Sequence, residues 1–368
     1  MDLTPNNQTC FLSLGLVVLD EIRLPGQEPL INVLGGSGAY ATLGARLFLP
    51  VPASRSVGLF LRVGRDFPES TIESLERWDV RLFIDKESER RSTRGLLEYK
   101  DTTFGPKTFK YTTTPLHVSI DSLHNTPLLS SKAFHFLESP QNITGRVSEL
   151  LTSRSTSSFR PDSPLIVWEP APLSCKAENL APCLQVLQGG IVDVFSPNHI
   201  ELAALFGEEA TPDIAKIESL ALRMLNSRAA YGTDDGSDRR KRTKPQTIVI
   251  RAGEHGCLVC GHNLKPTWLP PFYEPSPEGG QNAKIVDPTG AGNAFLGGYA
   301  VGYVTTGNLI EAGCYGAVAA SFALEQVGVP VMVAKGYEET WNGGRVLGRL
   351  EEYRRRVGLS GNETRAVD

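Results

Sequence analysis

Apolar and polar positions alternate in blocks along this chain, and the blocks predict a repeated succession of strands and helices. Short apolar runs rich in β-branched and aromatic residues predict strands at Phe11–Leu19, Ser56–Val63, Val80–Ile84, Ala133–Phe136, Leu165–Glu169, Ile191–Phe195, Thr247–Arg251 and Gly256–Cys260. Longer stretches with helical character are Gly38–Phe48, Pro68–Trp78, Gly145–Thr152, His199–Phe206, Ile214–Asn226, Gly290–Val304, Leu309–Gln326 and Gly344–Val357. Because the strand runs are apolar throughout, the pattern favours an α/β fold of three layers, with a mainly parallel central sheet between helices.

Two segments depart from this alternation and predict β-hairpins. Arg94–Tyr99 and Lys107–Tyr111 flank a turn, and the segment Val18–Val33 contains the turn Pro25-Gly26. Hairpins that stand off a parallel sheet can form a small β lid over one of its ends. We therefore predict a lid built from residues at about 18–34 and 94–111.

Composition narrows the classes of function. The chain has 368 residues, 40% hydrophobic residues and a net charge of −4, so no basic field points to nucleic acid or to an anionic membrane. No apolar run is long enough to span a bilayer, and Phe11–Leu19 lacks the basic residues and cleavage site of a signal peptide. We expect a cytoplasmic protein with one domain over residues 1–358 and a flexible tail at 359–368.

Two local motifs each allow two interpretations. Cys257 and Cys260 have the spacing of a zinc motif, but no second ligand pair follows, which favours buried cysteines in a strand. The basic run Arg239–Arg242 fits either a nuclear-localisation motif or, more simply, a solvated loop.

The most informative segment is the glycine loop Val286–Asn293, which runs into an apolar helix of small residues. Glycines at such a junction let backbone N–H groups approach a ligand, and the free N–H groups and dipole of the helix start favour an anion. The alternative is a helix start that merely packs tightly. The residues alone do not separate the two interpretations.

Motifs elsewhere appear together with this loop in a fixed order. They are the stretches Leu34–Ala45, Val57–Phe67, Trp168–Pro172, Asn198–Glu201, Arg251–Cys257 and Asp287–Asn293. In this order they resemble the signatures of the PfkB, or ribokinase-like, carbohydrate kinase family, over residues from about 10 to 335. The variants present, such as Tyr40 and Pro288, are similar to a fungal branch of Mak32-type members.

The resemblance implies roles for individual residues. It implies that the transferring phosphoryl group is stabilised by Gly290, Ala291 and Gly292, and that ATP is bound by Arg251, Gly253, Gly256 and Asp287. It also implies that substrate is bound by Asp20, Gly35, Gly36 and Ser37. Mg²⁺ would be placed by Asn198 and Glu201. Two of these assignments have plainer alternatives. The Asn198 and Glu201 pair also suits a helix N-cap, and the turn Gly253–Gly256 also suits a plain β-turn between strands.

Asn293 departs from the family pattern. The resemblance implies that the family has an Asp at this position, which acts as the catalytic base. The Asn amide cannot take up a proton, so two functions stay open. One is an ATP-dependent kinase of a sugar-like or nucleoside-like molecule, and the other is a pseudokinase that binds its ligands without turnover. A Rossmann dehydrogenase is a third reading, but the chain lacks an early Gly-x-Gly-x-x-Gly.

The partner that we expect is a small molecule, with a homodimer through the lid as a further option. Because a helix start favours negative charge, we also expect Asn293→Asp to be tolerated.

Overall fold

The structure is a computed structural model that describes residues 8–102, 104–105, 107–156, 162–226, 246–276, 282–335 and 338–359. Its strands are β1 (Phe11–Ser13), β2 (Val18–Arg23), β3 (Leu30–Gly35), β4 (Val57–Gly64), β5 (Arg81–Glu87), β6 (Arg94–Tyr99), β7 (Lys107–Tyr111), β8 (Ala133–Glu138), β9 (Leu165–Pro170), β10 (Val194–Phe195), β11 (Thr247–Arg251), β12 (Cys257–Gly261), β13 (Leu264–Leu269), β14 (Met332–Lys335) and β15 (Glu338–Trp341). Its α-helices are α1 (Ser37–Arg46), α2 (Glu69–Glu76), α3 (Pro140–Thr156), α4 (Leu180–Gly189), α5 (His199–Leu205), α6 (Ile214–Asn226), α7 (Ala291–Thr306), α8 (Leu309–Leu324) and α9 (Val346–Arg356).

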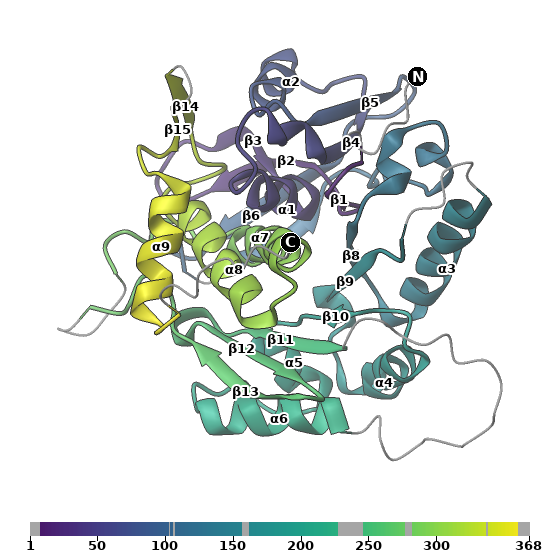
Figure 1. The fold of residues 1–368 in the computed structure, drawn as a ribbon. Helices are drawn as coiled ribbons and strands as arrows, with labels where there is room; N and C mark the ends of the chain where they lie inside the picture. Colours follow the sequence, from purple (N-terminus) through teal and green to yellow (C-terminus); the bar gives the residue numbers. More distant parts are fainter. Residues whose placement is uncertain are drawn as a thin grey trace.

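The central sheet has the order β13-β12-β11-β10-β9-β8-β1-β4-β5 (Figure 1). It is parallel from β11 to β5, and β12 and β13 extend it in antiparallel fashion. Successive residues of one strand enter different cores: in β9, Leu165 and Val167 join one apolar cluster, whereas Ile166 and Trp168 join the other. Both faces are therefore buried, and this explains the unbroken apolar runs.

Helices cover the two faces in separate groups. Helices α1, α7 and α8 pack on one face, and α3, α5 and α6 pack on the other. The three-layer arrangement predicted from the sequence is confirmed. Among the described residues no helix is long and apolar enough to cross a membrane.

The two predicted hairpins, β2–β3 and β6–β7, are both present, and they join into one small sheet of order β3-β2-β6-β7. The join is a parallel pairing of β2 with β6, in which Asp20 lies opposite Gly95. This sheet, called the lid below, carries Asp20 in β2.

The prediction of one strand over Phe11–Leu19 is wrong. The segment divides into β1 in the central sheet and β2 in the lid. The chain turns at Gly15, which lies so close to the start of α1 that a Cβ there would be 2.3 Å from Ser37 Oγ. Helix α4 and strands β13, β14 and β15 were not predicted. Pro182 obscured α4, although proline is tolerated in a first turn.

The structure describes the cysteine pair but not the basic run or most of the predicted tail. Cys257 and Cys260 are buried in β12, as predicted. The described residues contain no cluster of three or more His, Cys, Asp or Glu suited to a metal ion. The basic run Arg239–Arg242 and residues 360–368 of the tail lie outside the described residues.

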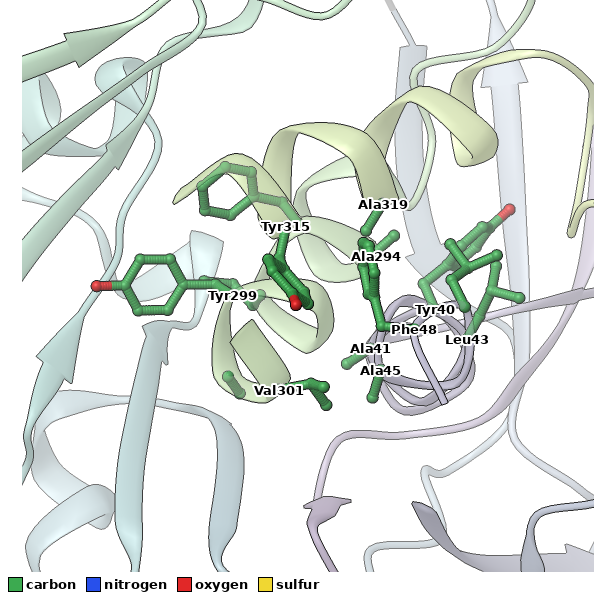
Figure 2. Close-up of a cluster of buried hydrophobic side chains, with 14 of the residues drawn as sticks. Tyr40, Ala41, Leu43, Ala45, Phe48, Ala294, Tyr299, Val301, Tyr315 and Ala319 are labelled. Atoms are coloured by element: carbon green, nitrogen blue, oxygen red, sulfur yellow. The ribbon is translucent and has the colours of Figure 1, made fainter. Parts of the chain in front are cut away.

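The second half of α1 and the first turns of α7 are held together by close backbone packing. Figure 2 shows Ala41 and Ala45 of α1 beside α7, where Ala294 lies. A Cβ at Gly297 would lie 1.9 Å from the carbonyl oxygen of Ala41, and one at Gly44 would lie 1.9 Å from that of Ala294. Glycine lets the two backbones touch, and this contact fixes the glycine loop against α1.

Candidate active site

The central sheet brings polar residues together at the carboxyl ends of its parallel strands. Ser13 ends β1, His135 lies within β8, Glu169 lies near the end of β9 and Arg251 ends β11. Because β1, β8, β9, β10 and β11 are consecutive in the sheet, these side chains line one edge. Ligands of open α/β sheets bind at this edge.

Glu169 is the centre of a buried polar network. Its side chain is 6% exposed, and Oε1 lies 2.8 Å from Arg251 Nη1. Its Oε2 accepts hydrogen bonds from His135 Nε2 at 3.1 Å and from Asn293 Nδ2 at 2.6 Å. Burial pushes the pKa of the Glu169 carboxyl upward, but the Arg251 guanidinium and the accepted hydrogen bonds outweigh burial, and the pKa is lowered.

The neighbours of His135 indicate which of its ring nitrogens donates a hydrogen bond to Glu169. Ser13 Oγ lies 2.9 Å from His135 Nδ1 and also accepts a hydrogen bond from the N–H of Gly15. A bare Nε2 would face a carboxylate oxygen without a proton between them. His135 therefore carries a proton on Nε2, whether or not Nδ1 is also protonated.

The glycine loop ends in an uncapped helix start. Gly290, the N-cap of α7, has φ +79° and no side-chain capping bond. In the described part of the chain, the N–H groups of Gly292 and Asn293 have no hydrogen-bond acceptor. A Cβ at Gly292 would lie 2.3 Å from Arg251 Nη1, so a guanidinium stands beside these donors. Free N–H groups, a helix start and a cation together suit an anion.

One face of the loop borders a cavity of about 720 Å³. The predicted site residues that line it are Asn198, Arg251, Gly253, Gly256, Ala291 and Gly292. Its walls are largely apolar and include Phe272, Phe295 and Leu324. The size and lining are those of a site for a small organic ligand.

Asn198 and Glu201 form a capping box at the start of α5. Asn198 Oδ1 accepts from the Glu201 N–H at 2.8 Å, and Glu201 Oε2 accepts from the Asn198 N–H at 2.7 Å. Oε2 also lies 3.5 Å from Arg251 Nη2. Burial raises the pKa of Glu201. The plainer alternative considered from the sequence, a helix N-cap, is thus present.

The turn Gly253–Gly256 is also a tight connection between strands. Gly253 has φ +58° and Gly256 has φ +81°, and the Gly256 N–H donates to the Gly253 carbonyl at 3.0 Å. A Cβ at Gly256 would lie 2.0 Å from the Leu269 carbonyl oxygen. The two glycines keep the turn close to the wall of the cavity.

The other face of the loop meets the lid. Asp20 is 5% exposed, and its Oδ1 has no hydrogen-bond partner among the described residues. A Cβ at Gly35 would lie 2.0 Å from Asp20 Oδ2, and one at Gly95 would lie 2.3 Å from Oδ1. Burial raises the pKa of Asp20 to about 7, while Lys107 lowers it.

Asp287 lies on the lid side of the loop and does not line the cavity. Its Oδ1 accepts hydrogen bonds from the Thr289 N–H at 2.9 Å and from the Tyr99 hydroxyl at 3.1 Å. Lys107 Nζ lies 3.8 Å from the same oxygen and donates to the Thr289 hydroxyl. Asp287 therefore ties the loop to strands β6 and β7 of the lid.

Gly36 and Ser37 shape the turn between β3 and α1. Gly36 has φ +89°, and a Cβ there would lie 2.3 Å from the Leu16 carbonyl oxygen. Ser37 Oγ is buried and has no partner within the residues that the structure describes. In the same helix, the Tyr40 ring packs on the loop, because a Cβ at Gly290 would lie 2.3 Å from it.

Sequence reasoning assigned no role to four residues of these networks, which are His135, Glu169, Tyr99 and Lys107. Glu169 lies within the stretch Trp168–Pro172, which matches a family motif, and this match could have indicated a role for it. His135 is a lone histidine in an apolar strand, and the two lid residues come from a hairpin of ordinary composition.

Comparisons with known proteins agree with this geometry. The family profile described as pfkB family carbohydrate kinase matches residues 30–334. An uncharacterised protein of Schizosaccharomyces pombe is 31% identical over 360 residues, which are 95% of this chain and 94% of that protein. Protein MAK32 of Saccharomyces cerevisiae is 29% identical over 95% of this chain and 93% of its own length. The structure of Arabidopsis thaliana ribokinase complexed with ribose and ATP superposes with a TM-score of 0.60 at 17% identity, covering 94% of this chain and 99% of that one.

Proposed function

The chain belongs to the pfkB family of carbohydrate kinases, and from this premise we propose that it transfers a phosphoryl group from ATP to a hydroxyl of a sugar-like or nucleoside-like molecule. One observation carries the proposal. The loop from Asp287 to Asn293 borders the 720 Å³ cavity on one face and contacts the lid residues Tyr99 and Lys107 on the other. A donor nucleotide and an acceptor hydroxyl could thus meet at one set of free N–H groups.

The chain's own groups fit the terminal phosphates of ATP. The N–H groups of Gly292 and Asn293 and the Arg251 guanidinium would neutralise charge as the bond to the leaving ADP breaks and the bond to the substrate oxygen forms. Arg251 is held by Glu169 and by the Ser196 carbonyl at 2.9 Å, so it would need little rearrangement.

Mg²⁺ is less directly provided for. The capping box and the Arg251 contact use Asn198 Oδ1 and Glu201 Oε2, which leaves Glu201 Oε1 as the free carboxylate oxygen of the pair among the described residues. One oxygen fits an ion that keeps most of its waters and binds mainly to phosphate. Bound there, Mg²⁺ would offset phosphate charge.

The lid favours a ring compound that bears hydroxyls. Asp20 can accept two hydrogen bonds from hydroxyl groups. Phe109, which is 49% exposed, lies over the same side of Gly95 as Asp20, because a Cβ at Gly95 would be 2.6 Å from its ring and 2.3 Å from Asp20 Oδ1. The Phe109 ring also contacts Tyr111 at 5.0 Å. A carboxylate beside an exposed aromatic pair can bind the polar edge and the apolar face of one ring.

Asn293 favours the second candidate, a pseudokinase that binds the same ligands without turnover. A general base contributes about 10²–10⁴ in rate, so its absence raises the barrier by roughly 3 to 5 kcal/mol. Against this, phosphoryl transfer depends mainly on positioning and charge stabilisation, which leaves a slower kinase as our first choice.

Two measurements on the purified protein test the proposal. Millimolar Mg-ATP should raise the melting temperature, and a screen of sugars and nucleosides should identify a compound that stimulates ADP release. A shift in melting temperature without ADP release over the panel would favour the pseudokinase. The absence of any shift would contradict both functions.

A further inference from the structure

The hydrogen bond between Asn293 and Glu169 joins residues that are 124 positions apart in the chain. Its length is 2.6 Å, and it directs Nδ2 of the amide to Oε2 of the carboxylate. Only the nitrogen end of an amide can face an ionised carboxylate, because the oxygen end would bring two acceptors together. The chemistry of Glu169 thus decides how the Asn293 amide is turned.

Glu169 remains ionised because cationic and donor groups surround it. Arg251 Nη1 and His135 Nε2 both contact the carboxylate, and its pKa is lowered despite burial. The carboxylate therefore acts as an acceptor toward Asn293 in the physiological pH range. With Nδ2 used in this way, Asn293 Oδ1 has no hydrogen-bond donor within the described ranges.

We propose that Glu169 is a positioning residue for Asn293, which it holds with Oδ1 available to accept a hydrogen bond from the substrate hydroxyl. Positions 169 and 293 then form a matched pair in which one member is a carboxylate and the other an amide. The role of Oδ1 toward a hydroxyl rests on the proposed kinase function. The pairing itself does not, because it concerns only the folded chain.

The pairing reverses the expectation that Asn293→Asp is tolerated. A helix start supplies about half a unit of positive charge, spread over several N–H groups. A second carboxylate would face the full charge of the buried Glu169 across a hydrogen-bond distance. Its pKa would rise, and the loss of stability would grow as the pH rises through that raised value.

The decisive experiment is a cycle of four proteins: parent, Asn293→Asp, Glu169→Gln and the double variant. Melting temperatures are measured from pH 5 to pH 8.5. We expect Asn293→Asp to melt roughly 3 to 6 °C below the parent at pH 8 and closer to it at pH 5. The double variant again pairs one carboxylate with one amide, and so it should lose most of this dependence on pH.

Asn308→Asp is the matched control, because Asn308 is the N-cap of α8 and accepts from the N–H groups of Ile310 and Glu311 on the surface. An aspartate there should leave the melting temperature unchanged or raise it. If Asn293→Asp behaves like this control at every pH, the pairing is wrong. If Glu169→Gln fails to rescue the double variant, Glu169 is not the partner, and the proposal also fails.

ADP release by the same four proteins separates the pairing from the kinase function. The pairing stands and the kinase function fails if the stability cycle shows coupling while no protein turns over any substrate. The reverse result is turnover by the parent without coupling in the stability cycle. It would support the kinase function and contradict the proposal that Glu169 positions Asn293. If both hold, Glu169→Gln should lower kcat more than it raises the substrate KM, because a neutral partner no longer fixes the amide.

Discussion

Replacing Asp20 by asparagine tests whether the lid holds a carboxyl group in a dry, unpaired state. Burial raises the pKa of Asp20 from its ordinary value of 3.8 to about 7. The folded state therefore binds a proton that the unfolded chain has released at intermediate pH. The contribution to stability is complete below pH 3.8, decreases as the pH rises, and is lost above about 7. Raising the pKa from 3.8 to about 7 corresponds to about 4 kcal/mol, at about 1.36 kcal/mol for each tenfold change in proton affinity.

Asparagine has nearly the same shape and does not titrate, so Asp20→Asn should gain stability relative to the parent as the pH rises. From pH 5 to pH 8 the free energy of unfolding of the variant should improve on that of the parent by about 3 kcal/mol, measured by urea unfolding. Asp121→Asn, which changes a side chain that is 84% exposed, is the control. A difference between Asp20→Asn and the parent that stays constant over this range would refute the reasoning.

Four further substitutions test the helix packing, the capping box and the anion cradle, which is the group formed by the N–H groups of Gly292 and Asn293 with the Arg251 guanidinium. Gly297→Ala would place a Cβ 1.9 Å from a carbonyl oxygen of α1 and should lower stability by about 1–3 kcal/mol, whereas Gly145→Ala, in open space on α3, should raise it by about 0.5–1 kcal/mol in the same urea titrations. Gly292→Ala should displace Arg251 and weaken Mg-ATP binding at least about tenfold by calorimetry, and it should also lower the melting temperature without nucleotide, because Glu169 would lose the cation that balances it. Glu201→Gln should weaken ATP binding more with Mg²⁺ than without it, and equal affinities in both conditions would leave Glu201 as a capping residue only.

The layers of the fold could be predicted from the sequence because each central strand is buried on both faces. In β4, the residues from Val57 to Val63 are apolar almost without interruption, and this feature distinguishes a covered parallel sheet from an open one. The division of the first apolar run into β1 and β2 could not be predicted in the same way. Both parts are buried, and a single buried serine, Ser13 at the end of β1, is too weak a signal to mark the point where the chain leaves one sheet for the other.

The predicted site residues divide along similar lines. The glycine loop and the capping box are each contiguous in sequence, so their residue types alone predict an anion site and a helix N-cap. The contacts of Asp287 depend on Tyr99, which lies 188 positions away, so the resemblance, which implied that Asp287 binds ATP, gave no indication of its contact with the lid. Pairings of this kind are fixed by tertiary structure and leave no local pattern.

The same reasoning explains why Asn293 alone does not decide between a kinase and a pseudokinase. When only the sequence of the loop is considered, Asn293 means that the carboxylate of the family pattern is absent. In the folded chain, a carboxylate lies one hydrogen bond away, at the end of a neighbouring strand, and it is balanced by Arg251. Restoring an acid at 293 would add a second negative charge beside the anion cradle and would oppose the phosphate that the cradle suits. Exchanging amide and carboxylate between 169 and 293 keeps the charge constant, and so this double exchange, and not Asn293→Asp, is the informative attempt to install a base.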